Sequence, residues 1–293
     1  MKKELLYHYT TGSALLGMLK DYDKENDNLN LTMWATHYKY MNDPTEFRGG
    51  VKWCKQAIIK IEKQLNIPLK KRIGSIINRK NFESYKNDNE SPFVISFSRA
   101  KDSLHMWNMY AQNGNGIALR FDKKKLTNWV TNKIGHCNIY DIHDCIYSSK
   151  ALSQEQIESI KEVYPFYLDI NYDKIGLKKL GISLDQTNDV HAYATMTLIY
   201  ILNAYPIKHE AYKEEKECRI IMYPTSEKKF RDKDGLIVPY IEQQIPFDCL
   251  DSIMVGPTAD FERVRESILL FLESKGIKWE EDKIKKSKVP YRN

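Results

Sequence analysis

The stretch Phe93-Val94-Ile95-Ser96-Phe97-Ser98 is an apolar run of β-forming residues that ends in serines. A short run of this kind, bounded by polar segments, predicts a buried strand. Two distant segments have the same character: Leu5-Leu6-Tyr7-His8-Tyr9, and Glu217-Cys218-Arg219-Ile220-Ile221-Met222-Tyr223. We predict that these three segments are strands of one curved core sheet, which would bring His8, Ser96 and Glu217 into the same part of the fold.

Further strands and helices are predicted on either side of these segments. Strands are expected at 31–36, 117–121, 236–242 and 253–255, and helices at 14–20, 102–111, 190–205 and 260–274. Because the strands are scattered among helices without a regular βαβ alternation, the predicted fold class is α+β. No stretch has the composition of a linker, so we expect a single domain over 1–293, with a helical insertion at approximately 150–205.

Three of the predicted helices have an identifiable N-terminal residue. In Asn42-Asp43-Pro44-Thr45-Glu46, the residue types fit a helix start with Asp43 as N-cap, Pro44 as the first helical residue and Glu46 reaching back to the cap. Ser13 is the expected N-cap of the helix at 14–20, and Asp102 that of a short helix carrying Trp107. Asn42 has no role in this interpretation.

Composition and charge limit the possible classes of protein. The 293 residues are 42% hydrophobic and 29% charged, with a net charge of +6, which permits an anionic partner without requiring one. The apolar run at the N-terminus breaks at once and no stretch could cross a bilayer, so we expect a soluble, cytoplasmic protein with no membrane partner. Five cysteines, an odd number with no Cys-x-x-Cys, indicate free thiols.

Most common catalytic and metal-binding motifs are absent. Gly114-x-Gly116 lacks the third glycine of a dinucleotide fingerprint, and neither Gly-x-Ser-x-Gly nor His-Glu-x-x-His occurs. His136-Cys137 and His143-Asp144-Cys145 could be combined into a zinc site, but paired strands would point alternate side chains to opposite faces. No metal is therefore expected.

The charged run at 208–219 leads directly into an apolar strand. Such a run is usually a solvated face. Here Glu217 and Arg219 should lie on one face of the strand at its start, where a carboxylate can act on a substrate in an adjacent cleft. Both interpretations remain open from the residues alone.

A series of short motifs resembles a large family of uncharacterised bacterial proteins. In chain order they are Leu6-Tyr7-His8-Tyr9-Thr10, Trp34-Ala35-Thr36, Met41-Asn42-Asp43-Pro44-x-Glu46-Phe47, Ile95-Ser96-Phe97-Ser98, Met106-Trp107-x-x-Tyr110-Ala111, Gly116-Ile117-x-Leu119-x-Phe121, Glu215-x-Glu217-Cys218-Arg219 and Gly256-Pro257. They span nearly the whole chain. The family has no established function, so the resemblance implies none.

A second, more distant resemblance is to the ADP-ribosyltransferases. These hold NAD on three strands that offer His or Arg, then Ser-x-Ser, then Glu-x-Glu, and His8, Ser96-Phe97-Ser98 and Glu215-Lys216-Glu217 occur in that order. The resemblance implies a curved central sheet with surrounding helices, NAD as substrate, and transfer of ADP-ribose or hydrolysis of NAD. The stretched spacing between the second and third motifs departs from the family.

Roles follow from this resemblance. Glu217 would stabilise the oxocarbenium-like ribose and Glu215 would deprotonate the acceptor. His8, with Tyr9 and Thr10 beside it, would bind the ribose, its imidazole donating a hydrogen bond to a hydroxyl. The other NAD-binding residues would be Ser96, Ser98, Trp107 and Tyr110, the aromatic ones by stacking. Taken singly, each has an ordinary structural explanation as a strand histidine, a strand end or a packed ring.

Two other functions stay open. One is a non-catalytic module that senses a nucleotide or a partner. The other is a nucleic-acid enzyme that uses Asp43, Glu46, Glu210 and Glu217 around a magnesium ion. For a transferase the acceptor is protein, nucleic acid or water, and a toxin or antiphage effector is the role suggested by analogy.

Overall fold

The computed structural model describes residues 3–22, 29–43, 45, 47–69, 72–73, 91–133, 139–169, 195–196, 199–223 and 227–291, with the backbone alone at 133, 139–141 and 165–169. The chain divides into two compact units. The sheet unit consists of Met1–Tyr40, Pro92–Cys145 and Ala211–Asn293, and the helical unit of Met41–Ser91 and Ile146–Glu210. The expectation of a single domain with an insertion at approximately 150–205 stays a prediction.

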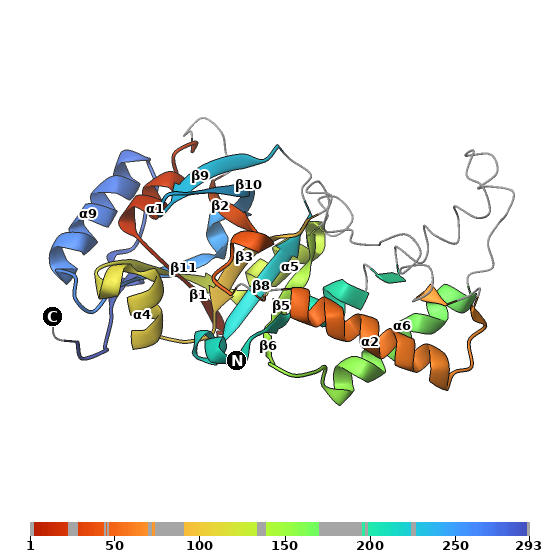
Figure 1. Ribbon diagram of the computed structural model, residues 1–293. Coiled ribbons are helices and arrows are strands. Elements are labelled where there is room, and N and C mark those ends of the chain that lie inside the picture. The colour runs from red at the N-terminus through yellow and green to blue at the C-terminus, as the bar shows by residue number, and fades with distance from the viewer. Residues whose placement is uncertain are drawn as a thin grey trace, which may run out of the picture. The chain divides into compact units, whose positions relative to one another are not determined.

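One large mixed sheet forms the centre of the sheet unit (Figure 1). Its main path runs β12 (Ile284–Lys286), β11 (Leu250–Val255), β4 (Ile117–Asp122), β1 (Leu5–Thr10), β3 (Phe93–Ser98), β2 (Asn30–His37), β10 (Leu236–Pro246) and β9 (Lys229–Lys233). Off this path, β8 (Glu217–Met222) pairs with β3 and with β5 (Ile139–Asp144). All these pairs are antiparallel except β11 with β12. The chain is thus a mixed α and β protein, as predicted at that level.

The two edges of β3 are used differently. One edge pairs with β8 along the whole strand, from Phe93 to Ser98. The other edge is shared, because β1 pairs with it at Ser98 and β2 pairs with it at Phe93 and Val94. Between these contacts, β1 and β2 leave the middle of β3 outside both ladders. We call this gap between β1 and β2, along the middle of β3, the split.

Each face of the sheet is covered by different helices. The α9 face packs its apolar side chains, among them Leu6 and Phe97, against α1 (Gly12–Met18), α5 (Lys123–Lys133) and α9 (Phe261–Ser274). In Figure 1, α1 and α9 lie close together on this side. The α4 face packs Tyr7 and Tyr9 against α4 (Leu104–Tyr110). Strand alternation therefore assigns neighbouring residues of β1 to different faces.

In the part of the helical unit that the structure describes, two long helices pack together. In the described residues, α2 (Arg48–Gln64) and α6 (Gln154–Asp169) are joined by a hydrogen bond of 2.7 Å from the Tyr164 hydroxyl to Glu62. A π-helical turn at Tyr200–Ala204 packs against α2, and the short strands β6 (Ile146–Tyr147) and β7 (Ile207–Lys208) pair in parallel. Within 150–205, helix is described at 154–169 and in the π-helical turn, while 170–194 lies outside the described residues.

The predicted start of the helix at Asp43 is wrong. α2 begins at Arg48, after Phe47 in a left-handed conformation with φ 63°. Asp43 is buried and accepts hydrogen bonds from the Thr45 N–H and hydroxyl, and at 3.1 Å from the His209 N–H. A short carboxylate readily bonds the backbone two residues on, which competes with capping. Pro44 and Glu46 lie outside the described residues.

Asp102 also has a different role from the predicted one. It precedes α4 in a left-handed conformation, and Ser103 occupies the N-cap position. Its carboxylate accepts from the Trp107 indole at 2.9 Å, from the Ser287 hydroxyl at 2.6 Å and from the Lys288 N–H at 2.7 Å. Asp102 therefore fastens the C-terminal segment to α4. For α1, the side chain that caps the helix is that of Thr11.

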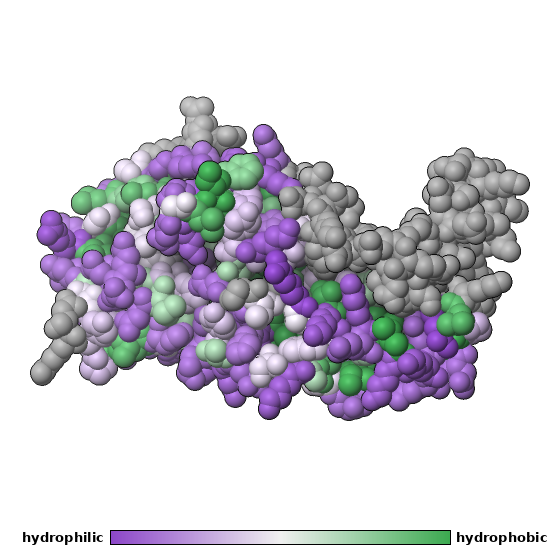
Figure 2. All heavy atoms as spheres, in the orientation of Figure 1, coloured by the Kyte–Doolittle hydropathy of each residue, from purple (hydrophilic) through white to green (hydrophobic). Residues whose placement is uncertain are grey.

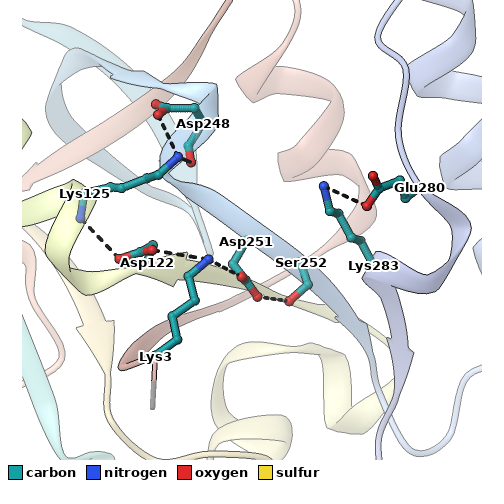
Figure 3. Close-up of polar contacts among 8 residues, drawn as sticks. All are labelled: Lys3, Asp122, Lys125, Asp248, Asp251, Ser252, Glu280 and Lys283. Atoms are coloured by element: carbon teal, nitrogen blue, oxygen red, sulfur yellow. Dashed lines mark hydrogen bonds and ion pairs between the residues drawn. The ribbon is translucent and has the colours of Figure 1, made fainter. Parts of the chain in front are cut away.

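Ion pairs near the surface join neighbouring strands of the sheet unit (Figure 3). The Lys3 ammonium lies 3.2 Å from Asp122 and 2.6 Å from Asp251, which joins the start of β1 to the end of β4 and to β11. Lys125 pairs with Asp248 at 2.9 Å. Pairs at the surface are screened by water, so each contributes little to stability.

The described surface is mostly polar, with apolar side chains scattered or in small patches on the face drawn in Figure 2. None of the helices in the described residues is long and apolar enough to cross a bilayer. Among the cysteines described, Cys54, Cys145, Cys218 and Cys249 are buried free thiols, as predicted, and Cys137 lies outside the described residues.

Gly256 provides a test of the packing at the end of β11. A Cβ at this position would overlap the carbonyl oxygen of Gly114, a backbone atom that cannot move aside. We expect Gly256→Ala to lower the free energy of unfolding in urea by about 1–3 kcal/mol or more. The same substitution at Gly17, in α1 with no atom near its Cβ, should instead stabilise by about 0.5–1 kcal/mol. Equal effects of the two variants would contradict the described packing.

Candidate functional site

The three strands with the candidate motifs are neighbours in the sheet. Tyr7 of β1 pairs with Ser98 of β3, and Ser98 pairs on its other side with Glu217 of β8. The prediction that His8, Ser96 and Glu217 lie on strands of one sheet is confirmed.

The side chains of these strands divide between the two faces. Residues directly opposite in antiparallel strands point to the same face. Tyr7, Ser98 and Glu217 therefore share the α4 face, together with Ser96 and Tyr9. His8 lies one residue on from Tyr7, on the face of Phe97. The sheet thus separates the predicted ribose-binding histidine from the predicted catalytic carboxylate.

His8 is half-buried at the split. Its Nδ1 lies 3.0 Å from the carbonyl oxygen of Ser96, and its ring meets Phe97 edge-on with centroids 6.0 Å apart. Because a carbonyl oxygen only accepts, Nδ1 carries the proton and donates it. Burial lowers the pKa of His8, the Ser96 contact partly opposes this, and the charge of Arg231 lowers it further. The neutral imidazole then presents Nε2 as an acceptor.

Arg231 of β9 and three residues of β2 and β10 form a second group near the split. The Arg231 guanidinium carbon lies 5.2 Å from the centre of the Trp34 ring and 5.9 Å from that of Tyr240, whose rings are 4.5 Å apart. Its Nη2 donates to the Thr36 hydroxyl at 2.9 Å. Burial lowers the pKa of Arg231. The register of β2 with β3 and β10 places all four side chains on the face of Ser96.

Sequence reasoning missed part of this group. Trp34 and Thr36 belong to the quoted motif Trp34-Ala35-Thr36, without a role assigned to them. No sequence pattern marks Arg231 as a site residue, because it lies in the polar segment 228–233, where a charged residue is expected to be solvated. Only the pairing of β9 with β10 brings it over the two aromatic rings.

The two glutamates of Glu215-Lys216-Glu217 are both buried and engaged. Glu217 forms an ion pair of 2.8 Å with Arg219, and the two side chains are 4% and 0% exposed. The same-face prediction for these two residues is confirmed. Glu215 accepts from the Tyr110 hydroxyl at 2.6 Å, while its carbonyl accepts from the Ser98 hydroxyl at 2.6 Å. These contacts hold both carboxylates in place.

The remaining candidates serve mainly as packing. Tyr9 is buried, donates to the Ala100 carbonyl at 2.7 Å and accepts from the Ser103 N–H at 3.1 Å. Its ring packs edge-on against the fully buried Trp107, with centroids 4.9 Å apart, so neither ring is open for stacking on a ligand. Thr10 pairs with the first residue of β4 and is half-buried.

The described residues contain no cluster of three His, Cys, Asp or Glu side chains that could hold a metal ion. His136 and Cys137 of the possible zinc site lie outside the described residues, as does Glu46 of the possible magnesium site. Of the other three magnesium candidates, Asp43 and Glu210 belong to the helical unit and Glu217 to the sheet unit.

Residues 106–220 match the model of a family described as "Protein of unknown function (DUF2971)". The match runs from α4 through β4 and β5 to β8, and so includes Tyr110, Glu215 and Glu217, but not His8. No curated protein and no solved structure matches the chain significantly. The similarity covers less than half of the chain and carries no activity with it.

The lowered pKa of His8 predicts a pH dependence of stability. Its folded pKa is below the ordinary value of 6.5, so the unfolded chain takes up a proton first as pH falls. The free energy of unfolding should therefore drop below about pH 6.5, by at most about 1.4 kcal/mol per pH unit from this residue. His8→Asn keeps a donor at the position of Nδ1 but cannot titrate. Urea unfolding between pH 8 and 5 should show a shallower slope for the variant, and parallel slopes would contradict the assignment.

The ion pair of Glu217 with Arg219 predicts strong coupling between the two residues. Glu217→Gln or Arg219→Met leaves one buried charge facing a neutral side chain, which costs about 3–5 kcal/mol. The double variant should lose clearly less than the sum of the single losses, as measured by a double-mutant cycle in urea. Glu158→Gln, in an exposed pair with Lys161, is the matched control and should change stability little. Additive losses at Glu217 and Arg219 would contradict the coupling.

Proposed function

We propose that this chain binds NAD at the split and either transfers ADP-ribose from it or hydrolyses it. The observation that carries the proposal is the split itself, where β1 and β2 part along β3 and leave the half-buried side chains of His8 and Ser96 beside it. The order of the strands also supports it, since the strands that carry His8, Ser96-Phe97-Ser98 and Glu217 are neighbours in one sheet.

The role of His8 in this proposal is to accept a hydrogen bond. With Nδ1–H donated to Ser96, its Nε2 can accept from a ribose hydroxyl and hold the sugar in one orientation. This differs from the donor role expected from the sequence. Trp34 takes over the stacking role expected of Trp107, because Trp34 is half-buried whereas Trp107 is enclosed.

Glu217 is the proposed carboxylate that stabilises positive charge on the ribose. Its ion pair with Arg219 fixes its position, so no reorganisation is needed when the charge develops. A ligand that used both His8 and Glu217 would have to reach from one face of the sheet to the other past the edge of β3. Glu215, held by Tyr110, is the proposed base for the acceptor, which is protein, nucleic acid or water.

A second candidate is a module that binds the nucleotide without cleaving it. One observation favours it: the Glu217 carboxylate is buried against a cation and lies on the face opposite His8. In that case Glu217 would be a structural residue, and the split would serve for recognition alone. If turnover occurs, a toxin or antiphage effector is the biological role we propose by analogy.

Release of nicotinamide from NAD by the purified full chain separates these candidates. The wild type should release nicotinamide, and Glu217→Gln should reduce the rate on the order of 100-fold or more because the transition state loses a fixed charge. NAD affinity should fall much less, since the ground state lacks that positive charge. Glu215→Gln should reduce transfer to an acceptor more than hydrolysis.

Folding must be checked in the same experiment, because Glu217→Gln also breaks the buried ion pair. Rates are therefore compared at a temperature where circular dichroism shows each variant folded, with Glu158→Gln as control. Binding of NAD without release of nicotinamide, with every acceptor tried, would favour the sensing module. Full turnover by Glu217→Gln would remove Glu217 from the mechanism.

A further inference from the structure

Arg231 is a half-buried cation that lacks a counter-ion in the described part of the chain. No described carboxylate forms an ion pair with it, and its Nε is buried without a hydrogen-bond partner there. The acid on the same face, Glu242, is already occupied by Lys229 at 2.6 Å and Lys20 at 3.5 Å. Burying a charge that has no counter-ion is costly, and a bound anion would offset that cost.

The surroundings of Arg231 hold its guanidinium in one orientation. Thr36 fixes Nη2, while the rings of Trp34 and Tyr240 support its plane. An oriented guanidinium matches the geometry of a phosphate and can bind it through two parallel hydrogen bonds. The strand β9, which carries Arg231, ends the main path of the sheet, so the residue lies at a margin that a ligand can approach.

Arg231 also acts on His8 at the split. Its positive charge is one of the causes that lower the pKa of His8, so the two side chains are near enough to interact electrostatically. Arg231 lies on the face of Ser96 and His8 on that of Phe97, so a ligand that reached both would have to pass through the split, with an anionic group for Arg231 and a hydroxyl donor for His8 Nε2. The half-buried indole of Trp34, 5.2 Å from the Arg231 guanidinium carbon, adds an aromatic ring beside the cation that a nucleotide base could contact.

We propose that Arg231, Thr36 and Trp34 form an anion subsite that binds a phosphate of a nucleotide. That this phosphate is the one in NAD rests on the proposed function, whereas the binding of a nucleotide phosphate by Arg231 does not depend on cleavage. ADP is a suitable probe because it carries phosphates and a base but no nicotinamide to release. Adenosine is the matched probe without a phosphate.

Calorimetric titration of the full chain with ADP tests the subsite. Arg231→Gln should weaken ADP binding on the order of 10–100-fold, the loss expected for a charged hydrogen-bonding partner. Arg231→Lys, which keeps the charge but not the fork of donors, should recover part of the affinity. Arg263→Gln, the same change on exposed α9, should leave ADP binding unchanged. Any adenosine binding should change little in Arg231→Gln.

The outcomes distinguish this inference from the proposed function. Unchanged ADP binding in a folded Arg231→Gln variant overturns the subsite, even if NAD is turned over. ADP binding that depends on Arg231, without nicotinamide release from NAD, supports the subsite and contradicts the catalytic proposal. A wild type that binds neither ADP nor NAD overturns both. If Arg231→Gln does not fold, Arg231→Lys and Thr36→Val decide by the same criterion.

Discussion

The architecture of the sheet unit depends on how β3 distributes its backbone hydrogen bonds. A strand has two edges, and backbone donors and acceptors that are buried without partners are costly. β3 gives one whole edge to β8 and divides the other between β1 and β2, which meet it at opposite ends. The backbone groups in the middle of that edge are therefore available for hydrogen bonds with side chains. His8 takes up the Ser96 carbonyl there, so a requirement of backbone pairing also determines the protonation and orientation of the histidine at the split.

Much of the fold could be predicted from local pattern. The run at 93–98 is a strand with the expected bounds, and α9 begins after Asp260, which caps it as its residue type suggests. The predictions that were wrong concern single polar side chains. Asp43 and Asp102 look like N-caps in the sequence, but each bonds to groups remote in the chain, His209 and Ser287, which no local pattern contains. Capping is a local preference of about 1 kcal/mol and is readily replaced by several simultaneous hydrogen bonds.

The candidate site shows the same limit in another form. The sequence gives the alternation of side chains along each strand, but only the register between strands decides which residues share a face. Tyr7 opposite Ser98 places His8 away from Glu217, and a shift of one residue would have reversed this. Arg231 was unpredictable for a related reason, because its environment comes from Trp34 and Tyr240 on other strands. Residue types at motif positions therefore predict which strands form the candidate site. They do not predict as well which side chains lie next to one another.

The carboxylate of Asp102 has a consequence for the order in which the protein can be completed on the ribosome. It accepts hydrogen bonds from the indole of Trp107, five residues on, but also from Ser287 and Lys288, which are synthesised 185 and 186 residues after it. The strand β12 that precedes them enters the sheet beside β11 equally late. The contacts that fasten Ser287 and Lys288 to Asp102, beside α4, can therefore form only after Lys288 has been synthesised. In a chain truncated before Ser287, the Asp102 carboxylate would keep the hydrogen bond from the Trp107 indole but lose those from Ser287 and Lys288.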